Sequence, residues 1–213
     1  MTYVKIRVDF EECEKGRFFR TLLVKKDLNL LTLAIAIVES FKGKLTHSFT
    51  FESGKVLYVP PFFEEISEGE EYMQENTVED LGKNFVFCYD LGECWNFKAK
   101  VYSKEIDEIY EDKNGDEQDV VFIDGAGQGI WEDNKQTLLM YLNGEIDPDN
   151  CEENEELGIY KPWNFKIKKY RDFDDKFNLE KEKKEFYDRY LFALNEFCDG
   201  EYSDILLENI TKD

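Results

Sequence analysis

A continuous apolar run near the N-terminus limits the fold more than any other part of the chain. It extends from Leu28 to Val38, eleven residues with two polar members. A helix that spans a bilayer needs about twenty apolar residues, so this run is too short to cross a membrane. As a helix it would be apolar on most of its circumference. The run therefore predicts a helix that is buried on nearly all sides against a sheet.

The residues that flank the run give this helix its expected ends. Asp27 or Asn29 can cap the first turn, because a short polar side chain accepts hydrogen bonds from free backbone N–H groups there. We expect the helix to extend through Phe41, and Gly43 to end it.

Alternating segments on both sides of the helix predict a mainly antiparallel sheet. Residues 2–10 alternate as a half-buried strand does. The other expected strands are residues 17–24, 47–51, 55–59, 84–89, 94–102, 120–123 and 163–170. Further helices are expected at residues 132–142 and from Asn178, with a capped turn at 77–80 and a last short helix from Ser203. Strands grouped with few helices between them predict one α+β domain over residues 1–213, with a C-terminal helical extension at about 178–213.

The negative charge of the chain belongs to its middle. The whole sequence carries 48 Asp and Glu against 27 Lys and Arg, a formal net charge of -21. Residues 46–160 account for -22, whereas residues 1–45 carry +3 and residues 161–213 carry -2. The acids are densest in residues 64–80, 105–119 and 145–156, which we interpret as solvated loops. The alternative is an acidic face for a basic partner or for cations. Because phosphate contacts need a basic surface, we expect no direct binding to nucleic acid or to an anionic membrane.

The cysteines and the start of the chain predict reduced thiols in the cytoplasm. No C-x-x-C pair occurs, the number of cysteines is odd, and the first residues show no signal-peptide pattern. The five cysteines are Cys13, Cys88, Cys94, Cys151 and Cys198. His47 is the single histidine, in an expected strand, so we interpret it as structural and predict no zinc site.

A glycine-rich segment at residues 124–129 (DGAGQG) lies between a strand and a helix, where a phosphate loop would lie. Its spacing is G-x-G-x-G, which is not that of a nucleotide-binding motif, and Glu132 and Asp133 follow it. Two acids would repel phosphate. The segment therefore predicts a tight structural turn.

Several carboxylates fall near strand ends or in loops, and two interpretations of them stay open. If the fold gathers them, they can hold Mg²⁺ or Ca²⁺, which prefer oxygen ligands. Otherwise they cap turns and a helix N-terminus at Glu132, where negative charge is favourable. These carboxylates are Asp90, Glu93, Asp124, Glu132 and Asp133. Trp95 and Trp131 lie beside glycine-containing turns, and we expect them to pack in or near the core.

Five segments resemble the root-inducing-plasmid ORF-3-like family, also described as transposon passenger proteins. Residues 89–95 (YDLGECW) resemble its Y-D-F-G-D-x-W segment, and residues 124–133 (DGAGQGIWED) its G-x-G-x-x-P-P-E-D loop. Residues 17–24 (RFFRTLLV) are similar to its W-R-R-x-x-V-P strand, residues 45–51 to its H-L-x-x-F strand, and residues 172–179 to its F-D-P-x-x-F-D-L ending. Phe19 replaces the usual Trp, and Ile130-Trp131 replaces the Pro pair.

The resemblance covers residues 3–195 and implies a curved, mainly antiparallel sheet packed against the N-terminal helix, with C-terminal helices. The family carries no established activity, so the resemblance implies no catalytic residue. It implies that seven positions are shared family positions, with the acids at 90, 132 and 133 exposed and outside the core. These positions are Asp90, Gly92, Trp95, Asp124, Gly127, Glu132 and Asp133.

Three functions follow as hypotheses. The first is a cytoplasmic binding or accessory protein of a mobile element, without catalysis or a cofactor and with a protein partner that would be basic. The mobile-element link comes only from the family's naming. The second is an acidic mimic of nucleic acid, which requires acids spaced like phosphates on one face. The third is a cation-dependent hydrolase that uses Asp90, Glu132 and Asp133.

Overall fold

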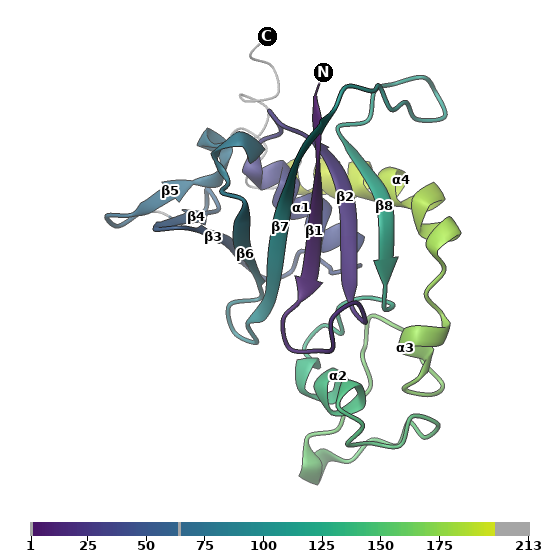
Figure 1. The fold of residues 1–213 in the computed structure, drawn as a ribbon. Coiled ribbons are helices and arrows are strands. Elements are labelled where there is room, and N and C mark those ends of the chain that lie inside the picture. The colour runs from purple at the N-terminus through teal and green to yellow at the C-terminus, as the bar shows by residue number, and fades with distance from the viewer. Residues whose placement is uncertain (1, 64, 199–213) are drawn as a thin grey trace.

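The chain folds into a curved, open sheet of eight strands with its two longest helices behind it (Figure 1). The computed structural model describes residues 2–63 and 65–198. The strands lie in the order β5-β4-β3-β6-β7-β1-β2-β8, and all neighbours are antiparallel except β4 and β5. Their bounds are β1 Tyr3–Phe10, β2 Phe19–Lys25, β3 Phe49–Ser53, β4 Val56–Val59, β5 Glu70–Tyr72, β6 Asn84–Tyr89, β7 Trp95–Ile106 and β8 Val120–Ala126. The predicted α+β class is confirmed.

The apolar run forms α1, Leu30–Ser40, at the centre of the core. The Asn29 side chain caps it by accepting hydrogen bonds from the N–H groups of Leu31 (2.8 Å) and Thr32 (3.4 Å). Every residue of α1 except Glu39 is buried. The helix packs against the inward-facing side chains of the sheet, which are largely aromatic on β3, β6 and β7. The apolar pattern on nearly all sides of α1 is explained by this position between the sheet and α4.

The second long helix, α4 (Leu179–Cys198), crosses behind α1 and β8. A buried carboxylate joins it to the end of α1: Glu182 Oε1 lies 2.5 Å from Lys42 Nζ, and its Oε2 lies 2.8 Å from Arg189. Both bases hold the pKa of Glu182 below its ordinary value, although burial opposes them. The predicted helix from Asn178 is confirmed, whereas the short helix expected from Ser203 lies outside the described residues.

A buried cation fastens β2 to the end of α1. The Arg20 side chain is fully buried and donates hydrogen bonds to the carbonyl oxygens of Ser40 (2.6 Å) and Ala126 (2.6 Å). It also donates to the carbonyls of Phe19 (2.7 Å) and Gly127 (2.9 Å). Burial lowers the pKa of Arg20 to about 9, so the guanidinium is still charged at neutral pH. Its donors are matched by the carbonyl groups at the negative end of the α1 dipole and in the turn after β8.

The predicted strand at Trp163–Tyr170 is wrong, because this segment forms bends and turns and no strand. The alternation of Trp163, Phe165 and Ile167 imitates a strand, but the backbone follows the surface of the loop before α2. Asn164 fastens it there by donating to the carbonyl of Ile130 (2.8 Å).

Three predicted element ends also differ. Helix α2 spans Lys135–Leu142 and does not start at Glu132, and β3 begins at Phe49, two residues after His47. Helix α1 ends at Ser40, and the left-handed residue that follows it is Lys42 (φ 56°), not Gly43. Gly43 is small for another reason, since a Cβ there would lie 2.6 Å from Val38 Cγ1. Two short elements had no prediction: β5 and α3 (Asp172–Asp175).

Two of the three acidic runs meet at Lys26, and the third lies away from them. Lys26 Nζ is 2.9 Å from Glu79 in the first run and 2.8 Å from Glu105 in the second. Figure 1 places the described part of the first run, residues 65–80, around β5, residues 105–119 between β7 and β8 at the top, and residues 145–156 beyond α2 at the bottom. Among the described residues, no helix combines the length and the apolar character that crossing a membrane requires.

Candidate functional site

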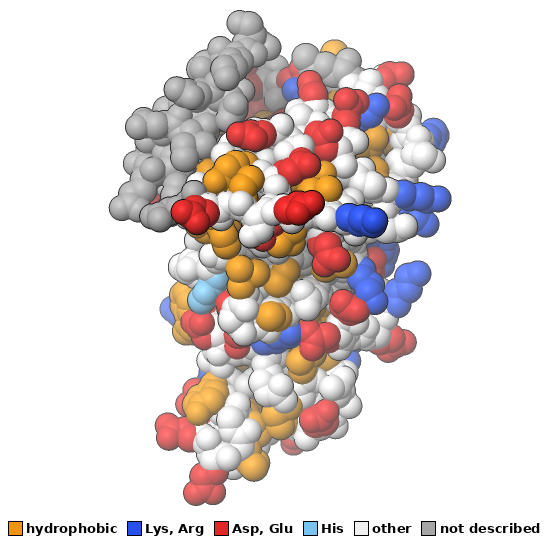
Figure 2. Space-filling model, turned by 90° about the vertical axis from the view of Figure 1, so that its left-hand side faces the viewer, with side chains coloured by type: hydrophobic (Ala, Val, Ile, Leu, Met, Phe, Trp, Pro, Cys, Tyr) orange, Lys and Arg blue, Asp and Glu red, His pale blue; other side chains and the backbone are white. Residues whose placement is uncertain are grey.

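Three loops from different parts of the chain meet beside the end of β6. His47 comes from the segment before β3, Asp90 from the β6–β7 turn, and Asp133 from the segment before α2. His47 Nδ1 lies 3.6 Å from Asp90 Oδ1, and His47 Nε2 lies 3.4 Å from Asp133 Oδ1. One ligand atom of each residue lies within 4.8 Å of the others. Figure 2 shows the pale-blue imidazole at the surface of the molecule.

The Asp90 carboxylate is placed by a tight turn. Asp90 has a left-handed backbone (φ 55°), and its Oδ1 accepts hydrogen bonds from the N–H groups of Gly92 (3.0 Å) and Glu93 (3.2 Å). Its own N–H donates to the carbonyl of Ser48 at 2.8 Å, next to His47. A non-glycine residue in this region carries strain that the surrounding contacts must offset. These contacts hold the carboxylate toward the imidazole, and the side chain is 7 % exposed.

Glu132 lies underneath the cluster and is fully buried. Its Oε1 accepts hydrogen bonds from the Lys44 N–H (2.6 Å) and from the Tyr89 hydroxyl (3.0 Å), and its Oε2 lies 3.8 Å from His47 Nε2. Burial raises the pKa of Glu132, and the donors from Lys44, Tyr89 and His47 oppose this shift. The expectation that Asp90 and Glu132 are exposed is wrong, because both are buried. Glu132 connects the His47 segment to the loop before α2.

Asp133 forms the outer edge of the cluster. It also has a left-handed backbone (φ 57°), its side chain is 57 % exposed, and its Oδ2 accepts a hydrogen bond from the Trp163 indole N–H at 2.9 Å. The Trp163 ring is itself 58 % exposed. Asn164 fixes the same segment, because its Oδ1 accepts a hydrogen bond from the Glu132 N–H at 3.2 Å. An exposed indole therefore stands beside the open side of the cluster.

The β6–β7 turn is also joined to α2. Glu93 accepts hydrogen bonds from the Trp95 indole (3.0 Å) and from the Lys135 N–H (3.3 Å). Glu93 therefore places a negative charge at the N-terminus of α2, the role that we expected of Glu132. The Lys135 ammonium donates back to the carbonyls of Glu93 (3.0 Å) and Cys94 (2.6 Å). Burial raises the pKa of Glu93. The turn that carries Asp90 is thus braced from two sides.

The remaining predicted positions have structural surroundings. Trp95 is fully buried in the core, and Gly92 leaves room for the Asp90 Oδ1, 3.2 Å from where its Cβ would be. Asp124 lies in β8 opposite Thr21, away from the cluster, and accepts a hydrogen bond from the Gly125 N–H at 2.9 Å. Gly127 (φ 77°) turns the chain after β8.

Sequence reasoning did not connect four contributors to the site. His47 was interpreted as structural, and Tyr89, Trp163 and Asn164 were not considered as site residues. The resemblance to the family's H-L-x-x-F strand marked the region of His47. It gave no indication that the imidazole meets carboxylates far away in the sequence.

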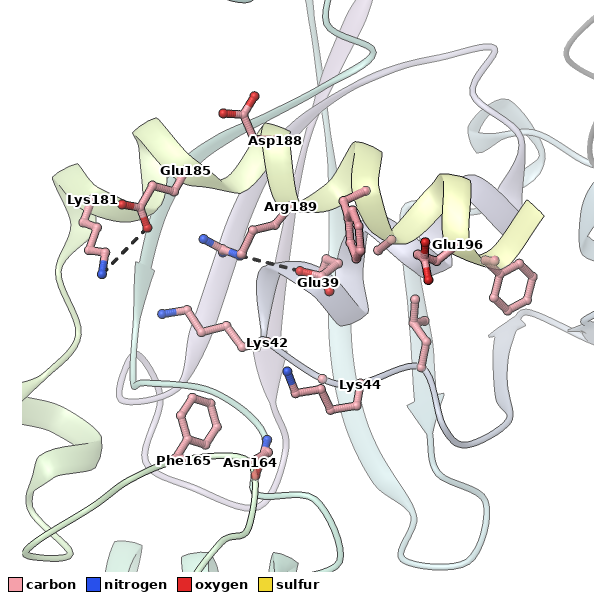
Figure 3. A pocket seen from close by; sticks show the side chains of 15 residues that line it. Glu39, Lys42, Lys44, Asn164, Phe165, Lys181, Glu185, Asp188, Arg189 and Glu196 are labelled. Carbon is pink, nitrogen blue, oxygen red and sulfur yellow. Dashed lines mark ion pairs between the residues drawn. The ribbon is translucent and has the colours of Figure 1, made fainter. Parts of the chain in front are cut away.

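A hollow of about 840 Å³ lies on the other side of Glu132, between α4 and the end of α1 (Figure 3). Lys42, Lys44, Asn164 and Phe165 face α4 across it, and Arg189 Nε lies 3.6 Å from Glu39. Asp90 and Asp133 do not line it. The ligand atoms of the cluster therefore meet outside this hollow, and Lys44, whose N–H donates to Glu132, is part of its lining.

The cluster has the donors for one cation. Imidazole and carboxylate together suit transition ions such as Mn²⁺ or Zn²⁺, whereas carboxylates alone suit Mg²⁺ and Ca²⁺. Metal–ligand distances of about 2.0–2.4 Å place ligand atoms on opposite sides of an ion less than about 4.8 Å apart, which matches the observed spread. His47, Asp90 and Asp133 would hold the ion, and Glu132 would orient the imidazole from below.

Comparison with known proteins identifies the family. The model of the plasmid pRiA4b ORF-3-like proteins matches residues 2–181. The chain belongs to this family. The turn of Asp90 and the pair Glu132-Asp133, which the sequence resemblance singled out, lie within the matched residues, and the fold brings them together around His47.

Solved structures with a similar fold include one from an archaeon. It is the crystal structure of a protein of unknown function from Methanosarcina mazei Go1. The sequences are 16 % identical, the TM-score is 0.55, and the match covers 76 % of this chain and 93 % of the other. At this identity the likeness shows a shared fold. A search of curated proteins found no match.

Glu132→Gln should change how stability depends on pH. The folded-state pKa of Glu132 is raised by burial above that of the unfolded chain. The stability that the protonated group contributes is then fully present below the unfolded-state pKa, and is lost as pH rises through the folded-state pKa. The unfolding free energy of the native protein minus that of Glu132→Gln should therefore fall as pH rises above the unfolded-state pKa of a glutamate. Urea titrations at several pH values measure it, and Glu145→Gln, at an exposed loop, gives the background. If this difference in unfolding free energy rises with pH instead, the folded-state pKa of Glu132 is not raised.

Proposed function

We propose that this protein is a cation-dependent accessory protein, in which an ion at His47, Asp90 and Asp133 joins three loops into a surface for a protein partner. The observation that carries the proposal is the convergence of these ligand atoms within 4.8 Å. Two of the three residues also have left-handed backbones, which cost free energy unless the geometry is required.

The buried acid under the cluster supports binding over catalysis. A general base has to reach the proton that it removes, directly or through one water. Glu132 is fully buried, and its oxygens already accept hydrogen bonds from Lys44 and Tyr89. It is placed to orient His47 and to hold two loops together.

The surroundings of the cluster support a basic protein partner. Leu157, Tyr160 and Trp163 are 64 %, 44 % and 58 % exposed, and they directly follow the acidic run at residues 145–156. Exposed aromatic and aliphatic side chains are typical anchors of protein interfaces, and the adjacent acids complement positive charge. The link to a mobile element rests on the family's description alone.

Isothermal titration with Mn²⁺, Zn²⁺, Mg²⁺ and Ca²⁺ tests the proposal. We expect one ion to bind per chain, with Mn²⁺ or Zn²⁺ preferred. His47→Ala and Asp133→Asn should each weaken binding by more than about tenfold, since each removes a ligand. At 100 times the dissociation constant, the bound ion should stabilise the protein by about 2.7 kcal/mol.

Asp175→Asn is the matched control, because Asp175 is exposed on α3, away from the cluster, and loses the same charge. It should bind the ion like the native protein. If none of the four ions binds, or if Asp175→Asn weakens binding as much as Asp133→Asn, the cation site is refuted.

A cation-dependent hydrolase is the second candidate, favoured by the open side of the cluster. The side chains of His47 and Asp133 are 28 % and 57 % exposed, so an ion there would keep positions for water or substrate. Hydrolysis of p-nitrophenyl phosphate that needs the ion and is lost in Asp133→Asn would favour it over the accessory role. A nucleic-acid mimic needs one continuous row of acids. The run at residues 145–156 lies at the opposite end of the molecule from the other two (Figure 1), and Lys26 stands between Glu79 and Glu105 where those two meet, which argues against a mimic.

A further inference from the structure

The face of the sheet opposite the helices is basic, in contrast to the rest of the chain. On β1, Val4, Ile6 and Val8 point into the core, so Lys5 and Arg7 point to the other face. On β7, Phe97 and Ala99 point into the core, and Lys98 and Lys100 are exposed between them. Both long helices lie behind the sheet in Figure 1, and Figure 2 shows Lys and Arg side chains gathered along its right-hand edge. We call Lys5, Arg7, Lys98 and Lys100 the basic face.

Two cations of this face are opposite each other in the sheet. Arg7 and Lys100 are direct cross-strand partners of β1 and β7, and like charges in this arrangement destabilise a sheet. Sequence features that destabilise the fold, such as two like charges opposite each other, are expected mainly at positions that have a function. Arg7 has partners of its own, since it pairs with Asp9 and lies 3.8 Å from the centre of the Phe19 ring, whereas no carboxylate of the described residues pairs with Lys100.

Asp9, Glu11 and Asp124 neutralise part of the charge. Asp9 is the direct cross-strand partner of Lys98, and Asp124 lies in the cross-strand row of Arg7 and acts on its charge. Asp9 accepts two hydrogen bonds from Arg7 (2.7 and 2.8 Å), and Glu11 lies 2.6 Å from Lys98. Among the described residues, no carboxylate lies within 4.0 Å of the Lys5 or Lys100 ammonium; both instead lie over the Tyr102 ring, 4.5 and 5.1 Å from its centre. The two lysines are free to bind an anion.

We propose that the basic face binds an extended acidic segment of another protein. Alternate residues of a strand are about 6.8 Å apart, both on β1 and β7 and in an extended peptide. A segment with acids at alternate positions therefore matches the spacing from Lys5 to Arg7 and from Lys98 to Lys100. Beside Lys98 and Lys100 the face is hollowed, with a volume of about 640 Å³ that can receive side chains.

A peptide fits this face better than a nucleic acid strand does. The basic face is short, with acids at both of its ends: Glu105 at the far end of β7, and Glu11 and Glu52 beside the hollow. A strand of nucleic acid would extend over these acids, and its phosphates would be repelled within the screening length of about 8 Å. A segment with a few carboxylates can end before it reaches them.

Fluorescence anisotropy tests the proposal with a short labelled peptide of alternating Glu and Thr. A peptide of alternating Gln and Thr and an oligothymidine of equal length are the comparisons. We expect the acidic peptide to bind, with affinity that falls as salt is raised, and the Gln peptide not to bind. Lys98→Glu/Lys100→Glu should weaken binding of the acidic peptide by more than about tenfold.

The matched control is Lys161→Glu/Lys166→Glu, which makes the same charge change at two exposed lysines away from the sheet. It should bind the peptide like the native protein. Circular dichroism establishes that both variants are folded. Absence of peptide binding, or an equal loss in the control, overturns the proposal. Tighter binding of oligothymidine than of the peptide, lost in Lys98→Glu/Lys100→Glu, overturns it in favour of nucleic acid.

Discussion

Arg20→Leu should destabilise the protein by about 3–5 kcal/mol, a large part of the stability of a domain of this size. The substitution leaves buried carbonyl groups of Ser40, Ala126 and Gly127 without the donor that now reaches them. Each unsatisfied buried carbonyl group costs about 1–3 kcal/mol. Part of this cost is offset, because the variant no longer has to bury the charge of the guanidinium. Urea titration monitored by circular dichroism measures the change as a lower transition midpoint.

Two variants separate this effect from the general loss of an arginine. Arg171→Leu removes an arginine whose side chain is 43 % exposed and paired with Asp149 at 2.6 Å, so it should cost about 1 kcal/mol or less. Arg20→Lys keeps the charge but not the fork of donors, and should lie between the native protein and Arg20→Leu. If Arg20→Leu is no worse than Arg171→Leu, the carbonyl groups do not depend on Arg20.

Gly127→Ala should cost about 2–4 kcal/mol, from two separate causes. The backbone at Gly127 is left-handed (φ 77°), which costs about 1 kcal/mol for a residue with a Cβ. The new Cβ would also lie 2.6 Å from Phe173 Cζ and 2.7 Å from Phe18 Cδ2, both in the packed core. Overpacking of this kind typically costs about 1–3 kcal/mol. Thermal and urea unfolding of the purified variant measure the total.

Gly144→Ala isolates the first cause. Gly144 has nearly the same backbone angle (φ 74°), but a Cβ there would meet no atom within 4 Å. It should therefore lose only about 1 kcal/mol. Equal losses at the two glycines would mean that the aromatic rings move aside and that the close approach at Gly127 is not required.

The local parts of the fold could be predicted because their physical cause is local. The apolar run specifies α1 since no other position buries so many sides of a helix, and Asn29 sits where the cap is needed. The β6–β7 hairpin follows from alternation on both sides of the turn at residues 90–93. The segment at residues 163–170 shows the limit of this reasoning. Its alternation is that of a strand, but its hydrogen bonds go to a loop that only the folded chain places nearby.

The candidate site could be predicted only in part. The family resemblance and the acid pairs pointed to Asp90, Glu132 and Asp133, whose convergence the structure shows. The role of His47 and the burial of Glu132 depend on contacts between distant segments, such as the hydrogen bond from Lys44 to Glu132. A carboxylate next to an exposed acid carries no local signal that it is buried. Arg20 belongs to a segment that resembles the family, but most of its carbonyl partners lie far away in the sequence, on α1, on β8 and in the turn after β8.

The spacing of the cluster along the chain has a consequence for folding. His47, Asp90 and Asp133 are 43 residues apart from one to the next, and no two belong to the same hairpin. Closing loops of this length is costly in entropy, so these three groups meet only after the sheet from β3 to β8 has assembled. A probe that responds to their proximity, such as the fluorescence of Trp163 beside Asp133, would thus report one of the last steps of folding.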